Sequence, residues 1–246
     1  MNYQLVILAG GKGTRMGETD TPKVLHPLHG KPLITHLLKE MKRLSWQYPP
    51  VVVVGFKHEQ VESALGEEYI YAMQEHQLGT RHAVLCAKDF VEAESIVVLY
   101  GDMPFIRAAS VENLAKLRES SGSPLAIFTT TVPSFTGEYA CFNGFGRILR
   151  DSVGSITAVR EFKDATPEER VVAEVNPGIY AFSSTWLWDH ISGIETNNVQ
   201  HEYYLTDMIA LAIRDGMNVP SLSIPTEEVF GINTKQELED AHAIEV

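Results

Sequence analysis

A glycine-rich stretch, Gly10–Gly13, follows the apolar run Leu5–Leu8 almost directly. Glycines allow the backbone to turn sharply and to present several N–H groups to one anion. Lys12, Arg15 and Lys23 bring positive side chains to the same part of the chain. This combination of residue types is typical of a loop that holds phosphate groups.

Other glycine motifs fit this loop less well. A dinucleotide-binding fingerprint read from Gly11 and Gly13 needs a small residue where Met16 stands, and a Walker A loop needs Ser or Thr where Gly13 stands. An ordinary turn after a strand needs fewer glycines and no basic residues behind it. The spacing therefore favours a cradle for nucleotide phosphates.

Two oxygen-bearing side chains are candidates for holding a divalent cation. Asp102 follows Gly101 at the end of an apolar run, and Asn233 offers a neutral amide oxygen. Mg²⁺ accepts such hard ligands together with waters and phosphates. The alternatives are that Asp102 forms a turn and that Asn233 and Thr234 cap the last helix.

The glycine loop and several later segments, in this order, resemble the signature of the sugar-phosphate nucleotidyltransferases. The specific resemblance is to the bacterial N-acetylglucosamine-1-phosphate uridylyltransferases. The segments are Gly10–Met16, Pro22–Leu28, Gly30–Leu33, Gln74–Ala83, Leu99–Pro104, Gly144–Ile148, Glu161–Pro167, Glu174–Tyr180, Glu202–Asp207 and Gly231–Asn233.

The resemblance implies an α/β fold with a single Rossmann-like, mostly parallel open sheet and helices on both faces, as in GT-A-like nucleotidyltransferases. We expect residues 1–246 to form one such domain, without the left-handed β-helix acetyltransferase domain of bifunctional members, because the chain has no hexapeptide repeats. The implied reaction joins a sugar 1-phosphate to a nucleoside triphosphate and releases pyrophosphate. UTP and N-acetylglucosamine 1-phosphate are the expected substrates.

The resemblance also assigns roles to individual residues. Arg15 and Lys23 are the expected catalytic cations, and Asp102 and Asn233 the expected ligands of the cofactor Mg²⁺. The expected nucleotide-binding residues are Leu8, Ala9, Gly10, Gly11, Gly13, Thr14, Gln74, Gly79, Thr80, Tyr100 and Gly101. The expected sugar-binding residues are Gly144, Glu161, Asn176, Tyr203 and Thr206.

Gln74 and the Gly79-Thr80 pair carry the base-binding interpretation. The Gln74 amide has a donor and an acceptor, which can pair with the N3–H and a carbonyl of uracil. Gly79-Thr80 lies at an expected helix start, where free N–H groups can meet a base or phosphates. The alternatives are that Gln74 is a solvated strand-end residue and that Thr80 is a plain N-cap.

Three positions depart from the family pattern. Pro177 follows Asn176 where Thr is usual, His201 replaces a Gly before Glu202, and Arg81 replaces a small residue after Thr80. Pro177 favours an extended backbone at Asn176, which we expect to leave its amide free to reach a sugar hydroxyl. The changes at Pro177 and His201 bear on the identity of the acceptor more than on the type of reaction.

Composition narrows the class of protein. The net charge of −12 argues against nucleic acid as a partner, because a duplex-binding protein needs a basic face. No apolar run approaches about twenty residues, so we expect no membrane span. Two cysteines form no disulfide framework and the amino end has no signal-peptide pattern, which favours a cytoplasmic protein.

The elements that must position these residues alternate along the chain. Continuous apolar runs at Leu5–Leu8, Val51–Val54, Ile96–Leu99 and Leu125–Phe128 predict strands buried on both faces of a parallel sheet. Helical spacing of apolar residues predicts helices over Pro32–Leu44 and Leu205–Ile213, with Gly216 ending the second. Ligands gather at the carboxyl ends of such strands, where both the glycine loop and Asp102 fall.

The expected chemistry needs no general base. A sugar 1-phosphate already carries a charged oxygen at pH 7, since the second pKa of a phosphate monoester is about 6. Two other functions stay open. One is the same reaction with another sugar 1-phosphate or with dTTP or CTP, and the other is a non-catalytic regulator that binds nucleotide sugars.

Overall fold

The computed structural model describes residues 2–17, 20–193 and 202–244. Its strands are β1 (Tyr3–Leu8), β2 (Pro27–Leu28), β3 (Lys31–Pro32), β4 (Val51–Val54), β5 (Ile70–Met73), β6 (Ser95–Tyr100), β7 (Leu125–Thr131), β8 (Gly146–Arg150), β9 (Ile156–Arg160), β10 (Glu174–Asn176), β11 (Tyr180–Ser183) and β12 (Ser221–Ser223). Its α-helices are α1 (Leu33–Met41), α2 (His58–Leu65), α3 (Thr80–Cys86), α4 (Ala108–Ser121), α5 (Pro167–Arg170), α6 (Ser184–His190), α7 (Asp207–Arg214) and α8 (Lys235–Ala241). None of the helices in these ranges is long and apolar enough to cross a membrane.

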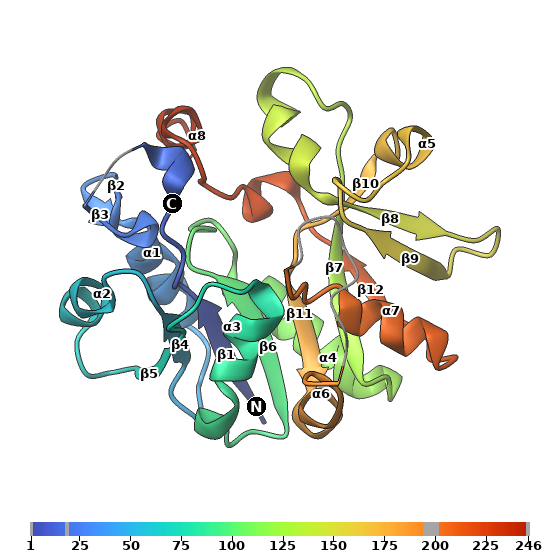
Figure 1. The fold of residues 1–246 in the computed structure, drawn as a ribbon, viewed down its shortest axis with the longest axis horizontal. Coiled ribbons are helices and arrows are strands. Elements are labelled where there is room, and N and C mark those ends of the chain that lie inside the picture. Colours follow the sequence, from blue (N-terminus) through green and yellow to red (C-terminus); the bar gives the residue numbers. More distant parts are fainter. Residues whose placement is uncertain (1, 18–19, 194–201, 245–246) are drawn as a thin grey trace.

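A large mixed sheet runs through the molecule in the order β5-β4-β1-β6-β11-β7-β10-β8-β9, with β12 beside β7 (Figure 1). Strands β5, β4, β1 and β6 are parallel to one another. Strand β11 is antiparallel to both β6 and β7, and β12 is parallel to β7. The fold class predicted from the sequence is confirmed, with an antiparallel extension formed by β8, β9 and β10.

Helices cover both faces of the sheet because its central strands are apolar on both sides. Leu5 and Ile7 of β1 belong to one hydrophobic cluster with residues of α1 and α4, whereas Val6 belongs to a second cluster with residues of α3 and α7. Successive side chains of a strand point to opposite faces, so each face of β1 belongs to its own hydrophobic cluster. This double burial fixes the sheet in the middle of the molecule.

The pairing of β1 with β6 brings two sequence motifs together. In this parallel register Leu8 lies opposite Tyr100, and the Gly101 N–H donates to the carbonyl of Leu8 at 2.9 Å. The glycine loop that follows β1 and the Asp102 turn that follows β6 therefore leave the same edge of the sheet side by side. The prediction that both motifs lie at the carboxyl ends of strands is confirmed, and the two strands are neighbours.

The helix predictions are confirmed with shifted ends. The helix expected over Pro32–Leu44 spans Leu33–Met41. It begins after Pro32 because Pro32 has an extended backbone and pairs in the short β2–β3 ribbon. The helix expected over Leu205–Ile213 is α7, and Gly216 ends it with a φ of 75°. The N–H groups of Gly216 and Met217 reach back to the carbonyls of Ile213 and Ala212, which is the hydrogen-bond pattern of a Schellman motif.

Arg147 of β8 holds the antiparallel extension together. It is fully buried, and its guanidinium donates to the carbonyls of Asn143, Phe145 and Arg170. The same group lies 4.2 Å from the ring centroid of Phe135. A buried guanidinium satisfied by backbone carbonyls fixes the loop on both sides of Gly144.

We expect Arg147→Met to lower the free energy of unfolding by about 3 kcal/mol, because buried carbonyls lose their donors. Urea denaturation measures the difference. The control Arg43→Met removes a guanidinium whose side chain is 75% exposed, and it should change stability by less than about 1 kcal/mol. An equal effect of the two variants would contradict the structural role of Arg147.

Candidate functional site

The glycine loop passes close to Lys23. Gly13 has a φ of 69°, and a Cβ built there would lie 2.7 Å from the Cβ of Lys23. Both the left-handed backbone and the close approach require glycine at this position. The loop thus wraps around the stem of Lys23 and directs its ammonium group toward the strand ends.

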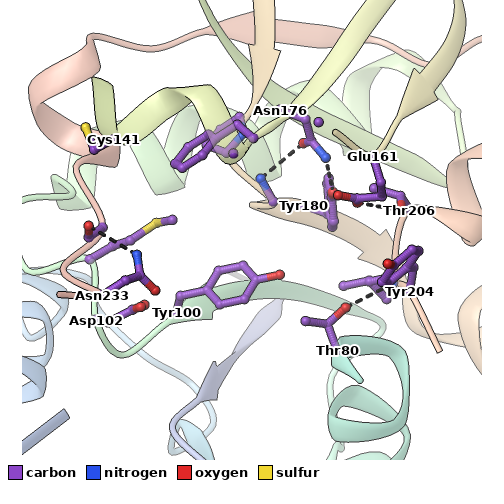
Figure 2. Close-up of a pocket in the computed structure, with 18 of the residues that line it drawn as sticks. Thr80, Tyr100, Asp102, Cys141, Glu161, Asn176, Tyr180, Tyr204, Thr206 and Asn233 are labelled. Atoms are coloured by element: carbon purple, nitrogen blue, oxygen red, sulfur yellow. Dashed lines mark hydrogen bonds between the residues drawn. The ribbon is translucent and has the colours of Figure 1, made fainter. Parts of the chain in front are cut away.

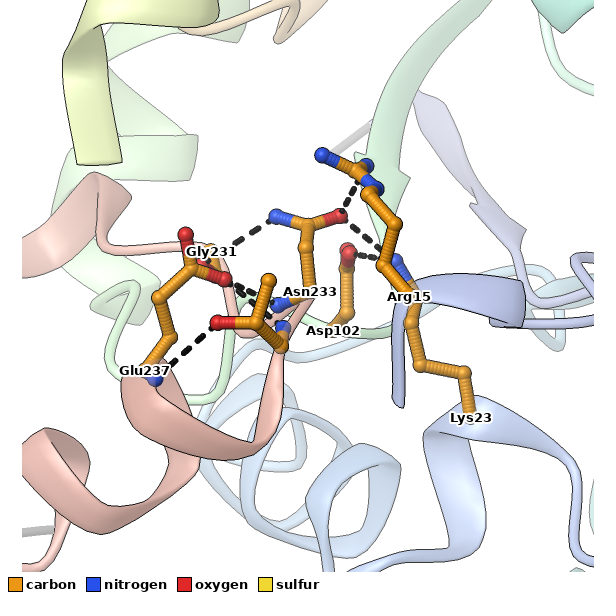
Figure 3. A network of polar contacts seen from close by, with 7 residues as sticks. Arg15, Lys23, Asp102, Gly231, Asn233 and Glu237 are labelled. Atoms are coloured by element: carbon orange, nitrogen blue, oxygen red, sulfur yellow. Dashed lines mark hydrogen bonds and ion pairs between the residues drawn. The ribbon is translucent and has the colours of Figure 1, made fainter. Parts of the chain in front are cut away.

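Lys23 lies at the centre of a polar network (Figure 3). Its Nζ forms an ion pair with Asp102 Oδ2 and donates to Asn233 Oδ1 at 3.0 Å. Arg15 Nη2 donates to the same Asn233 oxygen at 3.0 Å. Residues far apart in the sequence therefore meet, and the two predicted metal ligands both present oxygen atoms to one cation.

The start of α8 fixes the position of Asn233. Glu237 Oε2 accepts from the backbone N–H groups of Asn233 at 2.7 Å and Thr234 at 2.9 Å. Thr234 Oγ1 accepts in turn from the Glu237 N–H, so Thr234 and Glu237 form a capping box. Ile232 donates to the carbonyl of Asp102 at 3.0 Å, which ties this segment to the end of β6.

A cavity of about 290 Å³ lies beside the glycine loop, and we call it the nucleotide cavity. Its lining includes most of the residues predicted to bind nucleotide: Leu8, Ala9, Gly10, Gly11, Gln74, Gly79, Thr80 and Tyr100. Gly13, Thr14 and Gly101 are not among its lining residues. Gly13 and Gly101 support the cavity indirectly, since one packs on Lys23 and the other bonds to β1.

Gln74 is buried at the end of β5, not solvated, and its amide is partly engaged. Nε2 donates to the carbonyl of Gly79 at 3.2 Å and lies 3.2 Å from His82 Nδ1. Burial lowers the pKa of His82, which keeps its ring neutral and able to accept. Within the described part of the chain Oε1 has no hydrogen bond, so Gln74 presents an acceptor rather than the expected donor and acceptor pair.

Thr80 is not the N-cap of α3, contrary to one of the two interpretations of this position. Gly79 occupies the N-cap with a φ of 117°, and no side chain caps the helix. Thr80 Oγ1 accepts instead from the backbone N–H of Leu205 at 3.1 Å. A long-range partner therefore replaces the local capping bond that the sequence suggested.

A second cavity of about 300 Å³, which we call the acceptor cavity, lies between β6, β10, β11 and the loop around Gly144 (Figure 2). Four of the predicted sugar-binding residues line it, namely Gly144, Glu161, Asn176 and Thr206. Arg15, Asp102 and Asn233 line it as well. Tyr203 is not among the lining residues, and its ring stacks against Arg81 instead.

Asn176 has the extended backbone expected before Pro177, but its amide is not free. Nδ2 donates to Tyr180 Oη at 2.6 Å, and Oδ1 accepts from the Gly178 N–H at 3.1 Å. The expectation of an unengaged amide is therefore wrong, because a turn after Pro177 returns the chain to this side chain. One N–H of Nδ2 remains for a ligand.

Glu161 and Thr206 form another wall of the acceptor cavity. Thr206 Oγ1 donates to Glu161 Oε1 at 2.9 Å. Burial raises the pKa of Glu161, and the hydrogen bond from Thr206 offsets part of this shift. A desolvated carboxylate with one oxygen already bonded is a strong acceptor for a hydroxyl group.

The two cavities adjoin at shared residues. Thr80, Tyr100, Asp102 and Glu202 line both of them. Tyr100 is enclosed between them, and burial raises the pKa of its hydroxyl. Two ligands bound in these cavities would therefore meet beside Asp102, Lys23 and Arg15.

Sequence reasoning missed several lining residues. They include Tyr180 and Tyr204 in the acceptor cavity and Gln77 and Glu202 in the nucleotide cavity. Each lies within or next to a segment that carried the family resemblance, so their proximity to a motif was the available signal. The departure at His201 lies outside the described residues.

Comparisons with known proteins agree with this geometry. A family profile described as the MobA-like NTP transferase domain matches residues 5–173. The chain is 38% identical over 246 residues to the bifunctional protein GlmU of Clostridioides difficile, covering 99% of this chain and 52% of that protein. The bifunctional protein GlmU of Brevibacillus brevis is 36% identical, with 97% and 50% covered. The chain thus spans about half the length of these curated relatives.

Solved structures share the fold. A putative glucose-1-phosphate thymidylyltransferase from Bacillus anthracis superimposes with a TM-score of 0.76 at 21% identity, covering 98% of this chain and 94% of that one. The CMP:2-keto-3-deoxy-manno-octonic acid synthetase complexed with CTP gives a TM-score of 0.70 at 21% identity, with 99% and 98% covered. These likenesses show that the chain has the fold of nucleotidyltransferases.

The raised pKa of Glu161 predicts a pH-dependent stability. The folded state binds the carboxyl proton of Glu161 more tightly than the unfolded state does. Protonation of Glu161 therefore stabilises the fold at low pH, and this stabilisation is lost as the pH rises through the pKa of the folded state. Glu161→Gln should therefore melt at a higher temperature than the unaltered protein at pH 8, with a smaller difference at pH 5. Thermal unfolding across this range measures the trend.

The control Glu239→Gln changes an exposed carboxylate of α8 and should leave the pH trend unaltered. A Glu161→Gln variant whose stability advantage stays constant between pH 5 and pH 8 would contradict the assignment of this titration to Glu161.

Proposed function

Since the chain belongs to the MobA-like NTP transferase domain family, we propose that it transfers a nucleotidyl group from a nucleoside triphosphate to a sugar 1-phosphate. The products are a nucleotide sugar and pyrophosphate. UTP and N-acetylglucosamine 1-phosphate are the substrates we favour. The protein is then a uridylyltransferase of nucleotide-sugar biosynthesis.

The meeting of the two cavities carries this proposal. One is bounded by a glycine loop that can hold phosphates, and the other by hydroxyl and carboxylate groups that suit a sugar. They join at Asp102, where Lys23 and Arg15 supply positive charge. A triphosphate and a sugar phosphate placed in them would bring two anionic groups to the same point, which is what nucleotidyl transfer requires.

In the proposed reaction an oxygen of the sugar 1-phosphate attacks the α-phosphorus of the triphosphate. A new P–O bond forms there while the bond to the β-phosphate oxygen breaks, and that oxygen leaves as part of pyrophosphate. Arg15 and Lys23 offset the negative charge of the two approaching phosphates. No side chain has to remove a proton, because the attacking oxygen is already charged.

The residues of the network fit a bound Mg²⁺. Asp102 and Asn233 each present an oxygen, and both oxygens contact the ammonium group of Lys23, which supports a cation at this position. The described residues contain no group of three or more His, Cys, Asp or Glu side chains placed to hold a metal ion, so substrate phosphates and waters would complete the coordination. When bound, Mg²⁺ neutralises charge on the phosphates.

The engagement of Gln74 supports a uracil base. Its Nε2 is bonded to the carbonyl of Gly79, and Oε1 remains as an acceptor. Uracil offers a donor at N3–H, whereas cytosine has an acceptor at that ring position. A base with a ring N–H therefore suits the nucleotide cavity, and UTP or dTTP satisfies this condition.

We expect pyrophosphate release to require a nucleoside triphosphate, a sugar 1-phosphate and Mg²⁺ together. Asp102→Asn removes a ligand charge while nearly keeping the shape of the side chain, so kcat should fall about a hundredfold or more with folding intact. A coupled pyrophosphate assay measures both effects. The control Asp189→Asn alters an exposed carboxylate of α6 and should keep full activity.

Full activity in excess chelator would contradict the proposed requirement for Mg²⁺. No turnover with any pair from a broad panel of triphosphates and sugar phosphates would favour the non-catalytic binding protein instead.

The acceptor preference is tested separately. N-acetylglucosamine 1-phosphate should exceed glucose 1-phosphate by at least about tenfold in kcat/KM, which is the size of one well-used contact. Asn176→Ala should lower kcat/KM for the sugar phosphate and leave the KM for UTP almost unchanged, because Asn176 lines only the acceptor cavity. Steady-state kinetics with each substrate varied in turn measures this.

The control Asn218→Ala removes an exposed amide before β12 and should leave both constants unchanged. Equal use of the two sugars, or a loss of UTP affinity in Asn176→Ala, would show that the acceptor cavity is wrongly assigned.

A further inference from the structure

The segment Tyr203–Thr206 lies against the start of α3, and three of its residues line the acceptor cavity. Gly79 approaches it so closely that a Cβ built there would lie 2.6 Å from the carbonyl oxygen of Tyr203. Tyr203 donates to the carbonyl of Leu78 at 2.8 Å, and the Arg81 N–H donates to the carbonyl of Tyr203 at 2.8 Å. Backbone bonds thus hold this segment to the residues that follow Gln74.

The side chain of Arg81 adds a second set of contacts to the same segment. It is 2% exposed, and its guanidinium carbon lies 4.9 Å from the centroid of the Tyr203 ring. Asp207 is the first residue of α7, and its Oδ2 lies 3.6 Å from Arg81 Nη1, so the two side chains form an ion pair. Arg81 therefore contacts Tyr203, which precedes Thr206 by three positions, and Asp207, which follows it directly.

Thr206 connects the segment that Arg81 contacts with the acceptor cavity. Its hydroxyl donates to Glu161, and both side chains line that cavity. Arg81 itself is absent from the described linings of the two cavities. Any effect of the Arg81 side chain on a ligand is therefore indirect, and Tyr203–Thr206 is a part of the site that Arg81 helps to hold.

We propose that Arg81 is a positioning residue for the acceptor cavity: by stacking on Tyr203 and pairing with Asp207, it holds Thr206 where its hydroxyl orients Glu161. This inference rests on the proposed function, since it assigns Glu161 and Thr206 to the sugar phosphate. A guanidinium suits the role, because it stacks on an aromatic ring and bonds to a carboxylate at once. A small residue at this position would make neither contact.

Arg81→Met keeps much of the side-chain volume and removes both the charge and the planar fork. We expect the KM for N-acetylglucosamine 1-phosphate to rise about tenfold while the KM for UTP changes less than about threefold, because the coupling acts on one wall. Arg81→Lys, which keeps the charge, should recover part of the loss. The control Arg214→Met removes a guanidinium that is 74% exposed at the other end of α7, and it should change neither constant.

A double variant tests the path. In Thr206→Val, which lacks the hydroxyl that reaches Glu161, the further change Arg81→Met should raise the KM for the sugar phosphate by less than about twofold, because both changes remove the same interaction. If the two effects multiply, or if Arg81→Met weakens UTP and the sugar phosphate equally, the proposal is wrong. If Arg81→Met does not fold, Asp207→Asn tests the same pair and should give the same division between the two KM values.

The unaltered protein separates this inference from the proposed function. If it releases no pyrophosphate from any substrate pair, the proposed function has failed. If it is active and Arg81→Met has its kinetic constants, only the positioning role has failed.

Discussion

Parallel pairing of β1 with β6 is the constraint on which the site depends. The register that places Leu8 opposite Tyr100 makes both strands end at one edge, so the glycine loop and the Asp102 turn begin side by side. A shift of one residue would move every side chain of β1 to the other face of the sheet, so Leu5, Val6 and Ile7 would each have to pack in the opposite hydrophobic cluster. The hydrophobic core thus sets the separation between the glycine loop and Asp102, the carboxylate with which Lys23 pairs.

Around this edge, both local and long-range partners hold the polar side chains. Asn233 depends on Glu237 and on the bond between Ile232 and Asp102, while Lys23 depends on the turn that Gly13 permits. The two side-chain amides at the site, Gln74 and Asn176, already form hydrogen bonds with other residues of the protein. Gln74 still offers the acceptor Oε1, and Asn176 still offers one N–H of Nδ2. These remaining groups limit which atoms of a ligand each side chain can bind.

These hydrogen bonds within the protein are what the sequence could not predict. The strand Val51–Val54 was predicted with the ends that it has, because four consecutive buried valines specify a strand covered on both faces. The strand expected over Leu125–Phe128 extends to Thr131, because Thr129, Thr130 and Thr131 pair with strands distant in the sequence. The role of Thr80 was missed for the same reason, since its partner Leu205 lies 125 positions away. Local chemistry identified the motifs, and only the fold assigned their partners.

The departures from the family pattern are distributed unevenly over the site. Pro177 lines the acceptor cavity, and Arg81 supports a segment of its wall, whereas the glycine loop, Lys23, Asp102 and Asn233 keep the residue types that the proposed reaction needs. Charge stabilisation at the phosphates is common to all nucleotidyl transfers, so substitutions there would cost the chemistry itself. Substitutions around a sugar alter only the difference in affinity between competing acceptors. Under the proposed function, the acceptor cavity is therefore the part of this molecule in which sequence change can redirect specificity without loss of the reaction.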